Sequence, residues 1–405
     1  MLNSSPPNRP AEQSAERFPE PSQQRPSAET HQTLDASRLR AAIVSDAAPE
    51  RNGVGAYYRD LAEHLTALGA RIELISPRYR AGNWYGGLAL PLPGDPTQKF
   101  VLPWPSLIAR RFERLAPEVV IVPTPGPFGM IGMQLARQRK ARLVVGFHTH
   151  FERLAELNEH SRLFGSLAHT YLNACNRKLF RESHLVLANS DDMIEIARGI
   201  GARNVGLMGT SIPKRLLDEP ITTLRPRVER VLFAGRLAPE KNLGAVVEAA
   251  ETLTDMQFLV AGDGPLREWL VGEAARLPNL DYIGWVKRPR IMPLIDSVDA
   301  LVLPSTVESF GTVALEAMVR ARLVVVSAQC GILSWNLLKR GLFQMHDNET
   351  LSNTLRRMRK LDPAILERKV RIAREAAREL NNRNLRHWLR VLADGDTRGL
   401  DDVQH

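Results

Sequence analysis

The sequence predicts an α/β protein with two doubly wound parallel-sheet domains that face a central cleft. Short runs rich in Val, Ile and Leu alternate with amphipathic helical stretches, which is the pattern of strand–helix–strand units. The alternation stops at a segment rich in proline and charge, residues 212–227, and restarts at residue 230. The chain has 405 residues, and a single hydrophobic core stops growing at roughly 250–300 residues. Two domains therefore follow.

The first domain is expected over residues 38–211, after a tail. Residues 1–37 are rich in proline, serine and glutamine, so they cannot offset the entropy of ordering, and we expect them to be disordered. Their simplest interpretation is a flexible leader without a role of its own. The expected strands of the first domain are 39–45, 71–77, 118–123, 141–148 and 183–190, and its expected helices are 56–69, 128–139, 161–181 and 191–199.

The second domain is expected over residues 228–380, after an interdomain linker at 212–227. Its expected strands are 230–235, 257–262, 280–285, 300–305 and 322–328, and its expected helices are 242–253, 264–276, 289–296 and 312–320. After Pro363 the sequence becomes helical and basic. We expect residues 381–405 to form a C-terminal helix and tail that can pack back on the first domain.

The composition favours a cytoplasmic globular protein. Hydrophobic residues make up 44% and charged residues 24% of the chain, which excludes full disorder and collagen. The two cysteines lack disulfide or zinc-type spacing, so no metal site is expected. No apolar run approaches the roughly 18–20 residues that cross a bilayer. The expected location is the cytoplasm, with peripheral attachment at the inner face of the membrane as a further expectation.

The net charge of +9 suits several anionic partners. The basic residues are spread along the chain and aromatic residues are only 6%, so nucleic acid is not expected as a partner. The basic amphipathic stretch at 106–117 suits docking on an anionic membrane surface. Its pattern also fits an ordinary solvated helix face. The sequence does not determine the oligomeric state.

Two carboxylates, Glu308 and Glu316, bracket the turn between a predicted strand and a predicted helix. The free backbone N–H groups at the start of that helix point toward any ligand in the cleft. Glu308 can accept hydrogen bonds from hydroxyl groups, and Glu316 reaches another part of the same ligand. The spacing alone also fits a helix cap and an exposed glutamate.

The loop 235–242 supplies two cations, Arg236 and Lys241, directly after the first strand of the second domain. A guanidinium fork and a point charge at a strand end suit a diphosphate, because together they neutralise adjacent phosphoryl groups. A solvated basic loop is the alternative.

Two further features lie in the first domain. Gly53 and Gly55 could let the backbone approach phosphate, but G-x-G without a third glycine and a following acidic residue is a weak dinucleotide motif, which argues against a nicotinamide-dependent oxidoreductase. His148 ends a predicted strand and lies at the cleft edge. With His150 as its only near neighbour of that type, it is expected to be satisfied within the fold or to bind a hydroxyl, rather than to bind a metal.

Together these motifs resemble the family 4 glycosyltransferases, the retaining group 1 class with the GT-B fold of two Rossmann-like domains. The most specific stretches are GRLAPEKN at 235–242 and ESFGTVALE at 308–316. The stretches GFHTHF at 146–151, GDGP at 262–265 and YIGW at 282–285 occur in the expected order. The stretches at 209–213 and 328–335 depart from the usual pattern, without touching the central chemistry.

The resemblance implies roles for residues in both domains. Arg236 and Lys241 would hold the donor diphosphate, covered by backbone near Gly53 and Gly55. Glu308, Phe310 and Gly311 would bind the transferred sugar. His148 would contact the sugar near the reacting carbon. The residues expected to act in catalysis are therefore His148, Glu308, Arg236 and Lys241. The remaining donor-binding residues implied are Glu316 for the ribose, and Trp285 and Val286 for the base.

The resemblance also implies an activity. We expect a retaining hexosyltransferase that moves a hexose-type sugar from a nucleotide-diphosphate donor to a lipid or glycan acceptor, in glycolipid or cell-envelope polysaccharide synthesis. A UDP-sugar is favoured over a GDP-sugar, with no further cofactor. The alternatives are a glycosyltransferase with a soluble acceptor and a non-catalytic partner subunit of the same fold.

Overall fold

The computed structural model describes residues 36–51, 53–92, 95–148, 164–189, 191–308 and 310–395. All of these belong to one compact unit, residues 34–405. Most of the predicted tail lies outside the described residues. Its last residues are ordered, however, because Ala36–Arg38 form a turn of 3-10 helix and Ala36 packs into the core of the first lobe. The first lobe therefore includes residues 36 and 37, which were expected to belong to the tail.

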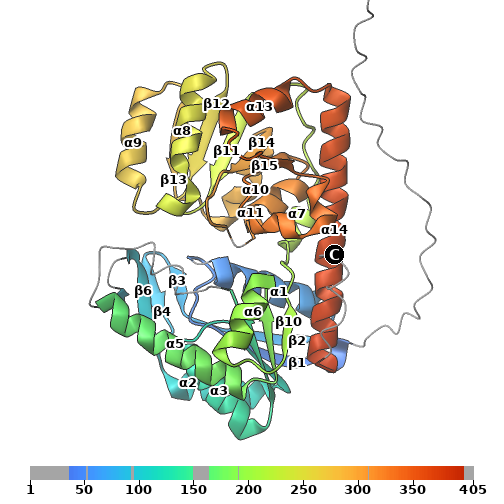
Figure 1. Cartoon of the computed structure of the whole chain (residues 1–405). Coiled ribbons are helices and arrows are strands. Elements are labelled where there is room, and N and C mark those ends of the chain that lie inside the picture. Colours follow the sequence, from blue (N-terminus) through green and yellow to red (C-terminus); the bar gives the residue numbers. More distant parts are fainter. Residues whose placement is uncertain are drawn as a thin grey trace, which may run out of the picture. The chain divides into compact units, whose positions relative to one another are not determined.

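The first lobe is a six-stranded parallel sheet in the order β10-β9-β8-β7-β1-β2, with helices on both sides (Figure 1). Alternate residues of one strand enter different cores: Ile43 packs on one face and Val44 on the other. The strands are β1 (Arg40–Val44), β2 (Arg71–Ile75), β7 (Val119–Val122), β8 (Arg142–Phe147), β9 (Leu185–Ala188) and β10 (Val205–Leu207), and the helices are α1 (Gly53–Ala67), α2 (Pro105–Leu115), α3 (Pro127–Arg139), α5 (Phe164–Glu182) and α6 (Asp191–Ile200).

Two antiparallel hairpins, which the sequence did not predict, follow β2. They pair β3 (Arg78–Arg80) with β4 (Asn83–Tyr85), and β5 (Gly87–Leu92) with β6 (Asp95–Pro103). Several side chains here are exposed and apolar, so the alternation of a half-buried strand is blurred. The hairpins connect the sheet to the basic helix α2.

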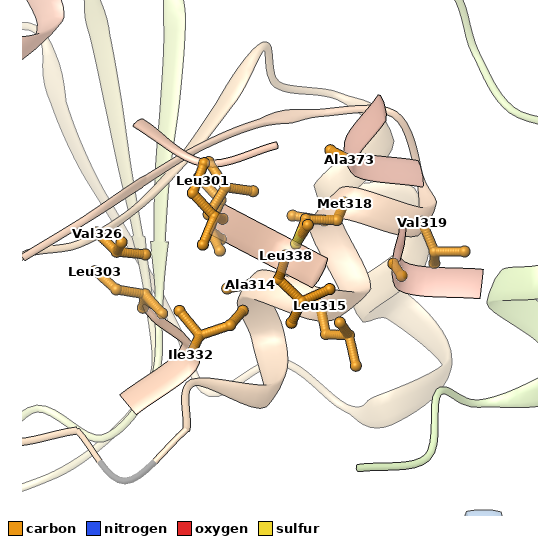
Figure 2. Close-up of a cluster of buried hydrophobic side chains, with 14 of the residues drawn as sticks. Leu301, Leu303, Ala314, Leu315, Met318, Val319, Val326, Ile332, Leu338 and Ala373 are labelled. Atoms are coloured by element: carbon orange, nitrogen blue, oxygen red, sulfur yellow. The ribbon is translucent and has the colours of Figure 1, made fainter. Parts of the chain in front are cut away.

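The second lobe repeats the first, with a parallel sheet in the order β13-β12-β11-β14-β15-β16. Figure 2 shows one of its cores, where Leu301, Leu303 and Val326 from the sheet pack against Leu315 and Met318 of α11. The strands are β11 (Arg230–Ala234), β12 (Gln257–Ala261), β13 (Leu280–Gly284), β14 (Ala300–Leu303), β15 (Leu323–Val326) and β16 (Phe343–Gln344), and the helices are α8 (Leu243–Thr252), α9 (Arg267–Arg276), α10 (Arg288–Asp296), α11 (Thr312–Val319), α12 (Asn336–Lys339) and α13 (Leu351–Arg359). The prediction of two doubly wound parallel-sheet lobes is therefore confirmed.

The last helix, α14 (Pro363–Ala393), packs on both lobes. Leu380 lies in a core of the second lobe, whereas Trp388 and Val391 lie in a core of the first. The indole N–H of Trp388 donates to the Tyr57 hydroxyl at 2.8 Å. The expected boundary at residue 380 thus falls inside one continuous helix, and residues 396–405 lie outside the described part of the chain.

The segment between the lobes, residues 212–227, is packed against the second lobe rather than free. It contains the short helix α7 (Lys214–Asp218). The buried Arg320 side chain donates to the carbonyl oxygens of Leu216, Glu219 and Pro220 and forms an ion pair with Asp296. These bonds satisfy a guanidinium that would otherwise be costly to bury.

Among the described residues, no helix is long and apolar enough to cross a membrane.

Candidate active site

Two loops of the second lobe meet at the carboxyl edge of its sheet. Residues 235–242 follow β11 and residues 304–311 follow β14, and these strands are neighbours. The backbone N–H of Thr306 donates to the carbonyl oxygen of Glu240 at 2.9 Å, and the Asn242 side chain donates to that of Pro304 at 3.2 Å. Because parallel strands end at one edge, loops far apart in the sequence form one surface there.

Lys241 and Glu308 form an ion pair across these two loops. Lys241 Nζ lies 2.6 Å from Glu308 Oε2, and the side chains are 18% and 17% exposed. Arg236 lies on the first loop with an exposed side chain. The expected phosphate-binding cation and the expected sugar-binding carboxylate are thus in direct contact, and partial burial strengthens their attraction.

The turn into α11 has the geometry of an open helix N-terminus. Gly311 has φ 83°, and a Cβ there would lie 2.9 Å from Leu303 Cδ1, so glycine is required at this position. Phe310 is buried against Trp335. Among the described residues, no side chain caps α11. Its first backbone N–H groups are therefore suited to an anionic or hydroxyl-bearing ligand.

Glu316 of α11 has a partner that the sequence did not predict. Its Oε1 lies 3.0 Å from Arg288 Nη1, and Arg288 Nη2 lies 2.5 Å from Asp60 Oδ2 in the first lobe. Burial raises the pKa of the Glu316 carboxyl, and the Arg288 guanidinium opposes that rise. The expected ribose-binding carboxylate is buried rather than merely exposed.

The glycine loop of the first lobe opens helix α1. A Cβ at Gly55 would lie 2.5 Å from the Ala47 carbonyl oxygen, so this glycine is required by packing, whereas a Cβ at Gly53 would meet nothing within 4 Å. The guanidinium of Arg51 lies over the rings of Tyr79 and Trp285, 4.7 and 5.5 Å from their centroids. This loop therefore touches the second lobe at the position expected for the base.

His148 follows β8 at the carboxyl edge of the first sheet. Its Nε2 lies 3.0 Å from the Tyr58 hydroxyl, and burial lowers the pKa of His148 to about 3. The imidazole is therefore neutral at physiological pH and suits hydrogen bonding to a hydroxyl. His150 lies outside the described residues.

The structure groups the predicted residues by lobe. Trp285, which is 48% exposed, and the half-buried Val286 follow β13, in the same lobe as Lys241 and Glu308 but two strands away from β11 in the sheet. No group of three or more His, Cys, Asp or Glu side chains in the described part of the chain could hold a metal ion.

The functional residues that the sequence did not predict are Arg51, Tyr58, Asp60 and Arg288. Of these, only Arg51 had a local signal, its place in the glycine loop.

Two family models match the chain. The model described as "Glycosyltransferase Family 4" matches residues 51–205, and "Glycosyl transferases group 1" matches residues 218–377. The chain therefore belongs to the group 1 glycosyltransferases of family 4, as its motifs suggested.

Individual relatives agree with this family. The chain is 37% identical over 109 residues to α-D-kanosaminyltransferase of Streptomyces kanamyceticus, an alignment that covers 25% of this chain and 28% of that protein. It is 22% identical over 324 residues to α-monoglucosyldiacylglycerol synthase of Acholeplasma laidlawii, covering 71% and 80%. The chain matches less than half the length of the first curated relatives.

The fold has relatives among solved structures. Sucrose-phosphate synthase from Thermosynechococcus elongatus superposes with a TM-score of 0.64 at 17% identity, over 85% of this chain and 95% of that chain. At this identity the likeness speaks for the fold alone, which is GT-B.

Proposed function

We propose that this protein is a retaining hexosyltransferase that uses a nucleotide-sugar donor and a lipid or glycan acceptor. The observation that carries the proposal is the Lys241–Glu308 ion pair, 2.6 Å long, beside an uncapped helix N-terminus. A cation, a carboxylate and free backbone donors are the groups that a glycosyl diphosphate needs around it. Family membership supports the same activity.

The donor would lie along the loops of the second lobe. Lys241 and Arg236 hold the diphosphate, Glu316 the ribose hydroxyls, and Glu308 with the backbone of Phe310 and Gly311 the sugar. The base rests near Trp285 and Val286, and the backbone at Gly53 to Gly55 covers the diphosphate from the first lobe. UDP is the favoured nucleotide.

The reaction breaks the bond between the anomeric carbon and the diphosphate oxygen and forms a bond from that carbon to an acceptor oxygen. The acceptor's hydroxyl proton goes to the departing diphosphate, which leaves from the face that the acceptor enters, so configuration is retained. Lys241 and Arg236 stabilise the growing negative charge without a metal. His148 contacts the sugar near the reacting carbon, and because its pKa of about 3 makes it a weak proton acceptor, it is not assigned as the base.

The acceptor would bind the first lobe. A cavity of about 760 Å³ lies there between α2, the end of β2 and the start of α3. Trp104 and Leu107 at its lining are 56% and 49% exposed, and Arg110 and Arg114 are exposed beside them. Apolar and cationic groups together suit a lipid acceptor and an anionic membrane surface. We therefore place the protein in the cytoplasm, peripheral at the inner face of the membrane, in glycolipid or envelope polysaccharide synthesis.

A panel of UDP-, GDP- and ADP-hexoses tests the donor. The matching donor should raise the melting temperature of the protein and be consumed when a lipid acceptor is added, and NMR of the product should report the anomeric configuration of the donor. A soluble acceptor that works without lipid would favour the alternative acceptor class. Donor binding without turnover on any acceptor would favour a non-catalytic partner subunit.

A further inference from the structure

One guanidinium lies between two carboxylates that come from different lobes. Arg288, the first residue of α10, is 2.5 Å from the Asp60 carboxylate of α1 and 3.0 Å from that of Glu316 in α11. The two carboxylate side chains are only 5% and 4% exposed. The contact with Asp60 is a hydrogen bond, whereas Glu316 Oε1 pairs with Arg288 by charge and has no hydrogen-bond donor among the described residues. Because a guanidinium is a planar fork, one side chain faces both carboxylates at once, each from a different Nη atom.

We propose that Arg288 is a positioning residue of the donor site, which orients Glu316 for the ribose hydroxyls and, through Asp60, makes donor affinity depend on contact between the lobes. This inference rests on the ribose-binding role of Glu316 in the proposed function. Arg288 acts through Glu316 and is not itself a catalytic residue.

The charges explain why Glu316 needs this neighbour. A carboxylate accepts hydrogen bonds from ribose hydroxyls best when it is ionised. Burial raises the pKa of both Glu316 and Asp60, and Arg288 is the cation that opposes the rise in each. Arg59 also lowers the pKa of Asp60 and Glu63 raises it, while Asp60 raises that of Glu316. Without Arg288, two buried carboxylates would face each other and Glu316 would be protonated more readily.

The helix that carries Asp60 also binds the connection between the lobes. The Tyr57 hydroxyl donates to the carbonyl oxygen of Gly209 at 3.0 Å, and His64 Nε2 lies 2.6 Å from that of Ile212. Helix α1 begins at the glycine loop, which is expected to cover the diphosphate. A movement between the lobes would therefore stretch the Arg288–Asp60 bond, and through Arg288 it would disturb Glu316.

Nucleotide binding to a set of variants tests the proposal. The set is Arg288→Ala, Arg288→Lys, Asp60→Asn and Glu316→Gln, with Arg290→Ala, an exposed arginine of the same helix, as the matched control. Calorimetry measures the Kd of UDP, or of GDP if only GDP stabilises the protein. Initial rates measure KM and kcat, and thermal melts report folding.

We expect Arg288→Ala and Glu316→Gln to weaken nucleotide binding about tenfold or more, since each removes a charged hydrogen-bond partner. Asp60→Asn should weaken it about threefold, because the bond to Arg288 is weakened rather than removed. KM should rise more than kcat falls, and Arg290→Ala should match the wild type. In Arg288→Ala, affinity should increase more steeply from pH 6 to 8.5 than in the wild type, as Glu316 ionises.

Wild-type affinity in Arg288→Ala, with binding lost in Glu316→Gln, would overturn the positioning role. If Arg288→Ala does not fold, Arg288→Lys and Asp60→Asn decide together, and wild-type affinity in both would overturn the proposal. If Glu316→Gln binds nucleotide normally, both the ribose role and this inference are wrong. The transferase proposal is then still judged separately, by the effect of Lys241→Ala on turnover.

Discussion

Asp46 in the first lobe and Glu308 in the second each follow an interior strand of a parallel sheet, β1 and β14. Asp46 accepts hydrogen bonds from the backbone N–H groups of Phe128 and Gly129, at 2.8 and 3.2 Å, where α3 begins. Glu308 instead pairs with Lys241, beside a helix that no described side chain caps. One lobe thus satisfies its helix N-terminus with a carboxylate, whereas in the other the carboxylate pairs with a cation and no described side chain bonds to the first N–H groups of the helix.

The surroundings of these carboxylates differ in the same way. The first lobe presents the neutral His148–Tyr58 pair and an apolar cavity beside α2. The second lobe presents the Lys241–Glu308 ion pair on the loops that follow β11 and β14, and the Arg288–Glu316 ion pair between α10 and α11. Because the architecture is shared, the difference between the lobes lies in their loops rather than in their sheets, and the proposed division between donor and acceptor binding rests on those loops.

The strongest test of this comparison removes Lys241, the cation that pairs with Glu308 in the second lobe. Lys241→Ala should lower kcat/KM by about 10²–10³, because the leaving diphosphate loses a fixed positive charge, and Arg236→Ala should act similarly. Initial rates of sugar transfer measure the effect, and Lys339→Ala, an exposed lysine of α12, is the control. Near-wild-type turnover in Lys241→Ala with an intact fold would refute the assignment.

Asp46→Ala tests whether the first-lobe carboxylate is structural. The change leaves two N–H groups of α3 and the Thr124 hydroxyl without their acceptor, so the free energy of unfolding should fall by about 2–3 kcal/mol. Denaturant melts measure the loss, while nucleotide affinity should stay within about twofold. Glu113→Ala removes an exposed ion pair of the same lobe and should cost less than about 1 kcal/mol. A stable Asp46→Ala protein that fails to bind nucleotide would show that Asp46 serves ligand binding rather than folding.

His148→Gln should lower kcat about tenfold, because one hydrogen bond near the reacting carbon is lost. The wild-type pKa of His148 is about 3, below its ordinary 6.5, so below pH 6.5 the unfolded chain binds a proton that the folded chain does not. The free energy of unfolding of the wild type therefore decreases by about 1 kcal/mol per pH unit as the pH falls from 6.5 toward 3. The variant should lack this decrease, because it has no imidazole to protonate. Melts at several pH values compare the two proteins, and identical pH dependence would show that His148 titrates normally.

The smallest effect is expected at the first-lobe surface. Trp104→Ala and Leu107→Ala should each weaken binding to anionic vesicles about three- to tenfold, because each removes an exposed apolar side chain beside basic residues. Cosedimentation at low and high salt measures this, with binding weaker at high salt. Ile365→Ala, equally exposed on α14, should change nothing. No wild-type binding even at low salt would exclude membrane docking.

Five of the six strands of each sheet could be predicted because they consist of apolar runs, such as Val119–Val122 and Leu323–Val326, that are buried on both faces. The short edge strands β10 and β16, of three and two residues, were not predicted. The ends of the predicted strands were set one or two residues too far, since Pro304 and Ser305 already belong to a loop. The hairpins between β2 and α2 were missed because exposed apolar residues blur their alternation. The helical stretch after Pro363 was predicted, but the domain boundary at residue 380 was placed inside it because one helix contributes to the cores of both lobes.

In the candidate site, too, the sequence predicts individual residues but not the contacts between them. Lys241 and Glu308 could be singled out because each follows a recognisable strand within a family-like stretch. Their contact could not, because it depends on β11 and β14 being neighbours although two other strands lie between them in the sequence. Asp60 and Arg288 are 228 positions apart and carry no local signal at all.

By itself, the sequence determined the two α/β lobes, the order of their main strands and helices along the chain, and the loops that carry Arg236, Lys241 and Glu308. These are consequences of local periodicity and of burial, which a few neighbouring residues encode. Only the tertiary structure decided which charged side chains pair, which carboxylate caps the N-terminus of a helix, and where one lobe touches the other. Such contacts depend on strand order and on the packing of distant segments, which short-range pattern does not contain.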